Sequence, residues 1–250
     1  MQASPWFIRR SPSNSSSPTL RLYCFTYAGG SAAVYLPWHR HLPDGVELCA
    51  VQLPGRGTRI REPLMRDFQQ LLRDLLQVFS QESSVPLVFF GHSLGAIVAF
   101  ELARLARLHH LPQPRHLIVS GCEAPQFRST PKNLHLLDDN QLIAALTGYE
   151  GTPRELMENS ELMALALPIV RADFSLVADY TYRTAPKLDM PVTVFEGLDD
   201  HEIDREHVHE WSRETTAACE LQWFPGGHFF INSAGASVIA SLKRALAAYL

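Results

Sequence analysis

The pentapeptide GHSLG at residues 91–95 places Ser93 between two glycines, in the pattern G-x-S-x-G. Residues 86–90 before it read PLVFF, an apolar run with the β-branched and aromatic bias of a strand. Apolar residues at helical spacing follow it, as far as Leu105. The pattern therefore predicts a sharp strand-to-helix turn that presents the Ser93 hydroxyl as a nucleophile at the end of a sheet. The alternative is an ordinary glycine-rich turn whose serine only caps the helix.

A serine hydroxyl needs a neighbouring base, and that base needs a third group to orient it. In sheets with such a turn, the chain order is nucleophile, acid, histidine. The predicted strand Val192–Glu196 is followed by Asp199 and Asp200, and the last predicted strand is followed by His228 in the loop PGGHFF. We expect Asp200 to be the acid, with Asp199 as the alternative, and His228 to be the base. All of them follow strand ends, where open α/β sheets bind their ligands.

The developing negative charge on a substrate oxygen also needs hydrogen-bond donors. The backbone N–H of Leu94, directly after the nucleophile, is the first expected donor. The second is expected from the loop FTYAGGS at residues 25–31, because two glycines after a strand allow the backbone to approach a substrate closely. A phosphate-binding loop is disfavoured, since the chain contains neither G-x-G-x-x-G nor a Walker pattern.

Strands and helices must alternate to bring these groups to one edge of a sheet. Strands are predicted over residues 20–26, 46–53, 86–90, 116–120, 191–196 and 219–224. Helices are predicted over residues 68–79, from the turn to about residue 109, and over 238–250. This order predicts an α/β fold with a mostly parallel central sheet flanked by helices. We expect one domain over residues 20–250, preceded by a loose Ser/Pro-rich tail over 1–19.

Between the strands that end near residue 121 and begin near residue 192, the alternation stops for about 70 residues. Helical patterns cover Asp138–Leu146, Pro153–Glu158 and Glu161–Tyr182. We predict a helical lid, at about 125–182, above the sheet end from which Ser93 emerges. An edge extension without a role is the alternative interpretation.

Composition excludes several classes of function. The 250 residues are 46% hydrophobic and 19% charged, which fits a folded domain with a large core, and the net charge of −4 gives no basic signal for nucleic acid. No apolar stretch approaches the roughly 20 residues that span a bilayer. Four scattered cysteines, and no apolar segment after the Arg9–Arg10 pair, indicate reduced thiols in the cytoplasm. No H-E-x-x-H pattern occurs, and we expect no metal and no cofactor.

Six segments together resemble type II thioesterases, the stand-alone editing enzymes of non-ribosomal peptide and polyketide synthetases. They are YAGGSAAVYLPW, QLPGRGTRIREP, GHSLG, LPIVRADFSLVADYTYR, GLDD and GGHFF. The likeness extends over nearly the whole chain from about Leu20, and the AGG loop, the PGR turn and the RADF helix are more specific than G-x-S-x-G alone. It implies an α/β-hydrolase fold with a helical lid inserted before the strand that carries the acid.

The resemblance implies hydrolysis of acyl thioesters on the phosphopantetheine arm of acyl or peptidyl carrier proteins, to clear aberrant or stalled acyl groups. It assigns the catalytic triad to Ser93, Asp200 and His228, and the oxyanion donors to Ala28 and Leu94. It further implies a monomer that binds its carrier protein transiently, without nucleic acid or membrane partners. The alternatives are a small-molecule carboxylesterase or lipase on the same fold, a medium-chain fatty acyl thioesterase, and a non-catalytic binding protein.

Two expectations concern surfaces. The last lid helix carries an apolar stripe that we expect to line an acyl channel: Leu162, Leu165 and Ile169. Three arginines near the PGR turn are candidates to contact an acidic carrier protein, and a packing role for the turn is the alternative: Arg56, Arg59 and Arg61.

Overall fold

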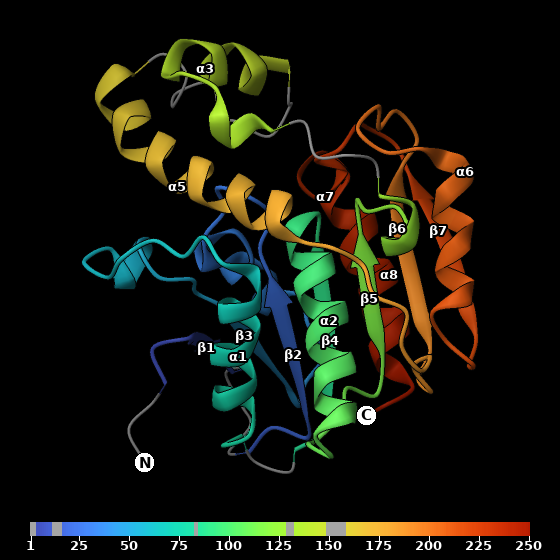
Figure 1. Cartoon of the computed structure of the whole chain (residues 1–250). Coiled ribbons are helices and arrows are strands. Elements are labelled where there is room, and N and C mark those ends of the chain that lie inside the picture. The colour runs from blue at the N-terminus through green and yellow to red at the C-terminus, as the bar shows by residue number, and fades with distance from the viewer. Residues whose placement is uncertain (1–3, 12–16, 83–84, 129–132, 149–158) are drawn as a thin grey trace.

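A single sheet of seven strands forms the centre of the molecule (Figure 1). The computed structural model describes residues 4–11, 17–82, 85–128, 133–148 and 159–250. The strand order is β1-β3-β2-β4-β5-β6-β7, with bounds Phe7–Arg10 (β1), Leu20–Phe25 (β2), Val46–Val51 (β3), Leu87–His92 (β4), Leu117–Ser120 (β5), Val192–Gly197 (β6) and Cys219–Phe224 (β7). β1 runs antiparallel to β3, and all other neighbouring pairs are parallel. The predicted mostly parallel sheet is therefore confirmed.

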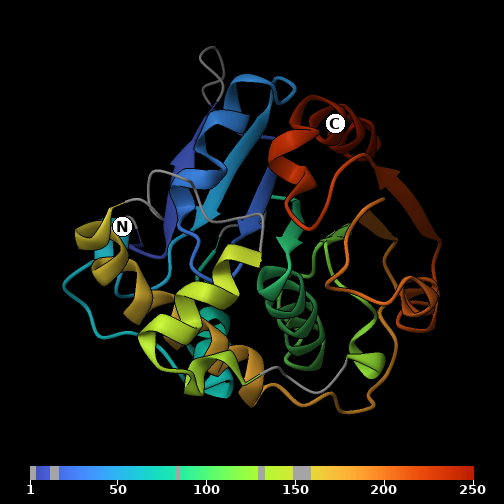
Figure 2. The ribbon, with the colours of Figure 1, turned by 90° about the horizontal axis from the view of Figure 1, so that it is seen from above.

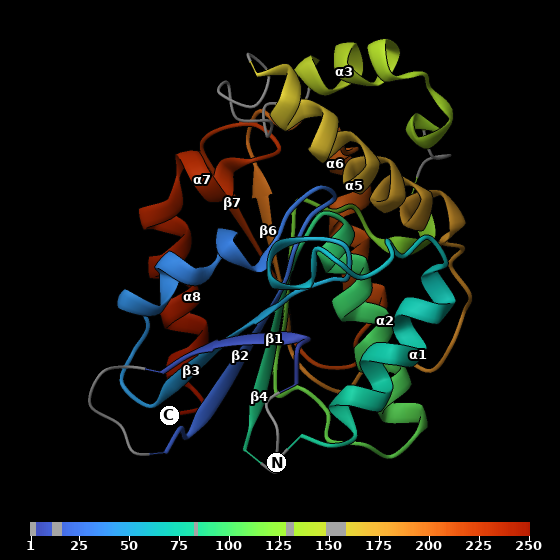
Figure 3. The same ribbon diagram turned by 90° about the vertical axis from the view of Figure 1, so that its left-hand side faces the viewer.

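Helices cover both faces of the sheet, as Figure 3 shows edge-on. The α-helices are α1 (Phe68–Phe79), α2 (Leu94–Leu108), α3 (Asp139–Gly148), α5 (Ser160–Asp179), α6 (Arg205–Val208), α7 (Phe230–Ser233) and α8 (Gly235–Ala247). Short 3-10 helices occupy Ala32–Val34, Leu36–Arg40, Gly57–Arg59, Pro125–Phe127, Leu134–Leu136 and His209–Arg213. One core cluster joins the sheet to α1 and α2, and a second joins its other face to α8. Among the described residues, no helix is long and apolar enough to cross a membrane.

The N-terminal segment differs from the expected loose tail, because β1 forms the edge of the sheet and pairs with β3. Trp6 and Phe7 are buried, and Arg9 bonds the carboxylates of Glu47 and Glu82 at 3.0 and 2.7 Å. The composition did not predict this strand, because only four residues of a Ser/Pro-rich segment form it. The pairing of β1 with β3 is accompanied by ion pairs to glutamates that are distant in the sequence, and not by a long apolar pattern.

The predicted lid is present as α3 and α5. α5 crosses above the carboxyl ends of the strands, and α3 lies on its outer side (Figures 1 and 2). At its C-terminal end, α5 is tied to α1 through a hydrogen bond from the Phe68 N–H to Asp179, at 2.9 Å. The helix predicted over residues 153–158 lies outside the described residues.

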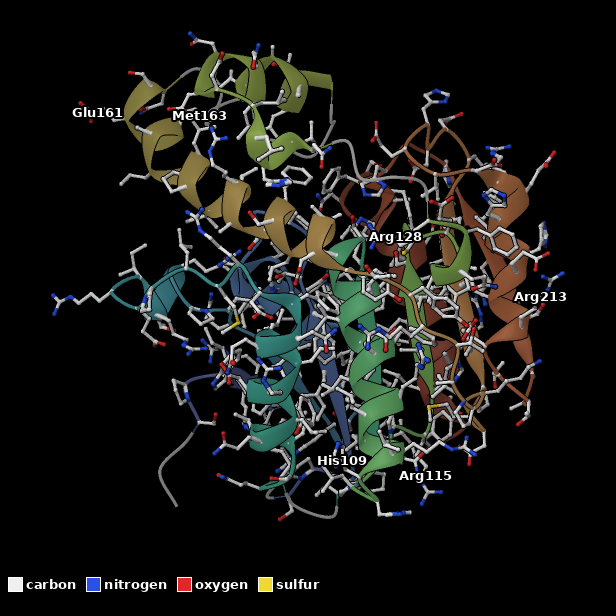
Figure 4. The ribbon with its side chains drawn as sticks, viewed as in Figure 1. His109, Arg115, Arg128, Glu161, Met163 and Arg213 are labelled. Carbon is white, nitrogen blue, oxygen red and sulfur yellow. The ribbon has the colours of Figure 1, made fainter. Side chains whose placement is uncertain are left out.

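The buried face of α5 is not the predicted stripe. Met163 and Leu167 pack against α3, and Figure 4 shows Met163 where α5 faces that helix. Leu162 and Leu165 are 47% and 70% exposed, and Ile169 is half-buried. The helix carries apolar residues on more than one face, so spacing alone did not identify the face that packs on α3.

Candidate active site

Ser93 sits at the predicted sharp turn between β4 and α2. Its backbone has φ 54° and ψ −116°, a strained conformation for a residue other than glycine. A Cβ atom at Gly91 would lie 2.1 Å from the carbonyl oxygen of Gly95, and one at Gly95 would lie 2.1 Å from that of Phe25. Both flanking positions therefore require glycine. Ser93 makes no side-chain cap hydrogen bond and is only partly buried, which argues against the capping alternative.

The structure pairs His228 with Asp200 and not with Asp199. His228 Nδ1 lies 2.7 Å from Asp200 Oδ2, and the two residues are 9% and 4% exposed. The other oxygen, Oδ1, accepts a hydrogen bond from the Glu202 N–H at 2.8 Å. Asp199 lies exposed. A carboxylate only accepts hydrogen bonds, so this contact places a proton on Nδ1 and leaves Nε2 as the acceptor.

The loops that carry these two side chains are joined by their backbones. The Leu198 N–H donates to the Phe224 carbonyl at 2.8 Å, and the Asp199 N–H donates to the Gly226 carbonyl at 2.9 Å. A Cβ atom at Gly197 would lie 2.5 Å from the Gly227 carbonyl oxygen. This close approach at the ends of β6 and β7 requires glycine and holds His228 against Asp200.

His92 links the histidine loop to the nucleophile turn. Its ring is fully buried, lies 2.9 Å through Nδ1 from the Ser120 hydroxyl, and has its centroid 5.2 Å from that of His228. A Cβ atom at Gly121 would lie 2.5 Å from this ring, so a glycine makes room for it. Burial, and secondarily the charge of His228, lower the pKa of His92 well below its ordinary value. His92 is therefore a neutral support behind His228, a role that the sequence pattern did not indicate.

The loop after β2 has two of its N–H groups already engaged. The Gly29 N–H donates to Asp173 Oδ2 on α5 at 2.7 Å, and the Gly30 N–H donates to the Tyr27 carbonyl at 3.0 Å. The predicted oxyanion donor, Ala28, directly precedes these two positions. The close contact between Gly95 and the Phe25 carbonyl sets the start of α2, and with it Leu94, beside the beginning of this loop.

A second buried carboxyl group lies at the end of β6, and the sequence patterns did not predict it. Glu196 is fully buried, and its Oε1 accepts a hydrogen bond from the Cys122 N–H at 2.9 Å. Burial first, and then the neighbouring carboxylates of Asp200 and Glu123, raise the pKa of Glu196 well above its ordinary value. Its one sequence signal is a charged residue inside the apolar strand VTVFEG.

Within the described ranges, no three acidic, histidine or cysteine side chains are arranged to hold a metal.

The arginines near the PGR turn correct one expectation. Arg56 and Arg59 are 3% and 7% exposed, so neither is free to contact a partner protein, whereas Arg61 is exposed. Arg59 bonds Glu62 at 2.6 Å and lies over the Trp6 ring at 4.1 Å. The packing role holds for these two residues, because their guanidinium groups are matched by carboxylates and carbonyl oxygens inside the fold.

Comparison with known proteins was consistent across sequence and structure. The thioesterase domain family matches residues 20–246. The linear gramicidin dehydrogenase LgrE of Brevibacillus parabrevis is 35% identical over 99% of this chain and 94% of its own length. The gramicidin S biosynthesis protein GrsT of Aneurinibacillus migulanus is 35% identical, over 92% of this chain and 89% of its own.

The structural neighbours agree. The type II thioesterase BorB from the borrelidin biosynthetic cluster superimposes with a TM-score of 0.88 at 32% identity, covering 98% of both chains. The neighbours share the α/β-hydrolase fold that the sequence predicted. The family match extends over most of the chain, and relatives above 30% identity cover nearly its whole length. The strained turn at Ser93 and the Asp200–His228 pair agree with these matches, and the chain belongs to the thioesterase family.

Proposed function

We propose that this protein hydrolyses acyl thioesters carried on the phosphopantetheine arm of acyl or peptidyl carrier proteins, and that it removes aberrant or stalled acyl groups during natural-product biosynthesis. The observation that carries this proposal is the Asp200–His228 contact of 2.7 Å, in a buried site whose histidine neighbours the Ser93 turn. Relatives named for gramicidin S biosynthesis and for the borrelidin cluster support the biosynthetic setting.

The chemistry follows from the protonation states of the site. Asp200 keeps the His228 proton on Nδ1, so Nε2 takes the hydroxyl proton of Ser93 as the serine oxygen bonds to the thioester carbon. The carbon–sulfur bond then breaks, and His228 returns the proton to the departing thiolate. Water next attacks the acyl-serine, gives a proton to His228, and releases the acid as Ser93 regains its hydrogen.

The N–H groups of Ala28 and Leu94 stabilise the charge on the carbonyl oxygen in both steps. Removing one such donor costs on the order of 10²–10³ in kcat in serine hydrolases. Thiols are stronger acids than alcohols, so the thiolate leaves readily once the tetrahedral adduct has formed.

The acyl chain has an apolar path proposed along α5. Of the three predicted channel residues, Ile169 is half-buried, whereas Leu162 and Leu165 are exposed. Polar substitution at Ile169 is expected to shift the preference for chain length, whereas an unchanged preference would remove this assignment.

The partner is proposed to be an acyl or peptidyl carrier protein, bound transiently by a monomer. All four cysteines are free, which supports the proposed cytoplasmic setting, where thiols stay reduced. Size-exclusion chromatography with light scattering, with and without carrier protein, tests the monomer.

The decisive experiment follows acyl-loaded carrier protein by mass spectrometry, with wild type and with Ser93→Ala. We expect discharge by the wild type only, with turnover by the variant reduced by on the order of 10⁶. A free oxyester and a medium-chain acyl thioester are run beside it. Faster turnover of the oxyester would favour a carboxylesterase or lipase, and preference for the medium-chain substrate would favour a fatty acyl thioesterase.

A non-catalytic binding protein would fail to label at Ser93 with a fluorophosphonate. The name of the LgrE relative denotes a dehydrogenase, whereas the strained G-x-S-x-G turn and the paired histidine of this chain favour hydrolysis.

A further inference from the structure

Three segments that are far apart in the sequence meet in one buried ion pair. Arg56, from the PGR turn, donates through Nη1 and Nη2 to both carboxylate oxygens of Asp173, from the RADF segment of α5, at 2.5 and 2.6 Å. The third segment is the AGG loop after β2. Its Gly29 N–H donates to Asp173, and its Gly30 carbonyl accepts from Arg56 Nη1 at 3.1 Å. The Arg56–Asp173 pair therefore binds this loop at two points, one backbone donor and one backbone acceptor.

The ion pair is closed to solvent. The side chains of Arg56 and Asp173 are 3% and 0% exposed. Two-point contact between a guanidinium and a carboxylate fixes orientation as well as distance, and lysine does not reproduce it. Such a contact is suited to hold a loop in one position.

α5 also touches the loop directly. Gly29 has φ +81°, and a Cβ atom there would lie 2.9 Å from the Val170 side chain, which is on α5. Val170 lies three positions before Asp173, on the same side of the helix. The lid helix and the oxyanion loop are thus one packed unit, joined by a backbone contact and an ion pair.

We propose that Arg56 and Asp173 are positioning residues for the oxyanion hole, an inference that rests on the proposed function. By holding the Ala28–Gly29 and Gly30–Ser31 peptide groups, they orient the loop so that the Ala28 N–H points at the substrate oxygen. Because Asp173 belongs to α5, the hole is complete only when the lid helix is seated. This explains why the AGG, PGR and RADF segments occur together: each supplies one part of the same clamp.

The test compares Asp173→Asn and Arg56→Lys with two control variants. Asp139→Asn removes the ion pair between α3 and Arg171 of α5 at 2.6 Å, without touching the loop. Glu82→Gln weakens a largely buried ion pair at the opposite end of the sheet, where it bonds Arg9 and Arg21. The controls report what a disturbed lid and a weakened fold do by themselves.

Two readouts separate positioning from a general structural role. With an acyl thioester substrate, both test variants should lose on the order of 10² in kcat, as for a displaced oxyanion donor, with KM changed by less than about threefold. The second readout is inhibition by a trifluoromethyl ketone, whose carbonyl carbon bonds to the Ser93 oxygen while its own oxygen becomes an alkoxide in the hole and the serine proton passes to His228. Its affinity should fall by a similar factor in the test variants and stay within about twofold in the controls.

Equal affinity for the ketone in wild type and in both test variants would overturn the inference, whatever the natural substrate. Equal losses in the control and test variants would overturn it as well, because the effect would then come from general destabilisation. If Asp173→Asn fails to fold by circular dichroism, Arg56→Lys decides alone, since it keeps a positive charge beside Asp173. A wild type that binds the ketone but does not discharge carrier protein would refute the proposed function only.

Discussion

Changing Asp200 to asparagine tests the assigned acid with the least change in shape. The structure determines how the new amide must lie. The Glu202 N–H donates to Oδ1 at 2.8 Å, so the amide oxygen occupies that place and the NH₂ group occupies the place of Oδ2. There it faces His228 Nδ1, which was 2.7 Å from the carboxylate. An NH₂ donor makes Nδ1 the acceptor and moves the ring proton to Nε2.

The size of the effect follows from that tautomer. With Nε2 protonated, His228 no longer takes the proton of Ser93. Loss of the correct tautomer in a serine triad lowers kcat by about 10⁴-fold. Because each tenfold step corresponds to about 1.36 kcal/mol, the barrier rises by about 5.4 kcal/mol. Substrate binding is unaffected by the ring tautomer, so KM should change little.

The matched control is Asp199→Asn, one residue earlier. Its side chain is exposed, and the backbone bond from its N–H to the Gly226 carbonyl is retained in the variant. A surface substitution of this kind should leave kcat within about twofold of wild type. The assay is release of free thiol from an acyl thioester, followed with a thiol-reactive dye. An equal loss in both variants, or an Asp200→Asn variant within about tenfold of wild type, would refute the reasoning.

Two further predictions concern stability. Burial raises the pKa of Glu196 in the folded protein well above its ordinary value of 4.5, so the unfolded chain loses this proton at lower pH than the folded protein does. Above that ordinary value, rising pH therefore favours unfolding by up to about 1.4 kcal/mol per pH unit, until the folded pKa is reached. The glutamine in Glu196→Gln has no titrating group. In urea unfolding at pH 5, 6, 7 and 8, the free energy of unfolding of the variant minus that of the wild type should therefore increase with pH. A difference that stays constant with pH would contradict the burial argument. Gly95→Ala forces a methyl group to 2.1 Å from the Phe25 carbonyl oxygen and should destabilise the fold by about 3 kcal/mol. At Gly235 an added Cβ atom would meet nothing within 4 Å outside its chain neighbours and its own helix backbone, so Gly235→Ala should be neutral or slightly stabilising in the same thermal unfolding experiment. Equal melting temperatures for the two variants would show that crowding at the turn is unimportant.

Local sequence patterns were sufficient for much of the fold. The alternation of strands with helices predicted the mostly parallel sheet, because each element carries its own hydrophobic period. The turn at Ser93 was predictable because the pattern G-x-S-x-G occupies five consecutive residues. The demand for glycine at position 91 arises within the turn, from the Gly95 carbonyl, whereas the demand at position 95 comes from the Phe25 carbonyl on β2. The lid was recognised because a long helical segment broke that alternation.

Other features depended on distant contacts. Asp199 and Asp200 are adjacent residues of the same type, so the sequence did not distinguish them. The loop geometry at the ends of β6 and β7 places only Asp200 against His228. β1 belongs to the sheet because it pairs with β3. A strand of four residues is too short for its hydrophobic pattern to predict this pairing. The sequence left open whether Arg56 contacts a partner protein or packs within the fold, and α5 decided for packing by supplying Asp173 as its buried partner.

The sequence by itself therefore determined most of the strands and helices, the position of the candidate nucleophile Ser93, and the order in which the candidate acid and base follow it. These properties depend on short-range periodicity and on the residue types that follow each strand. Only the tertiary structure decided which aspartate meets the histidine, which face of the lid helix is buried, and which charges are paired inside the fold. Those outcomes depend on how separate elements of the chain pack together, across 28 positions for Asp200 and His228 and 117 positions for Arg56 and Asp173. The free energy of such contacts has no local signature in the chain.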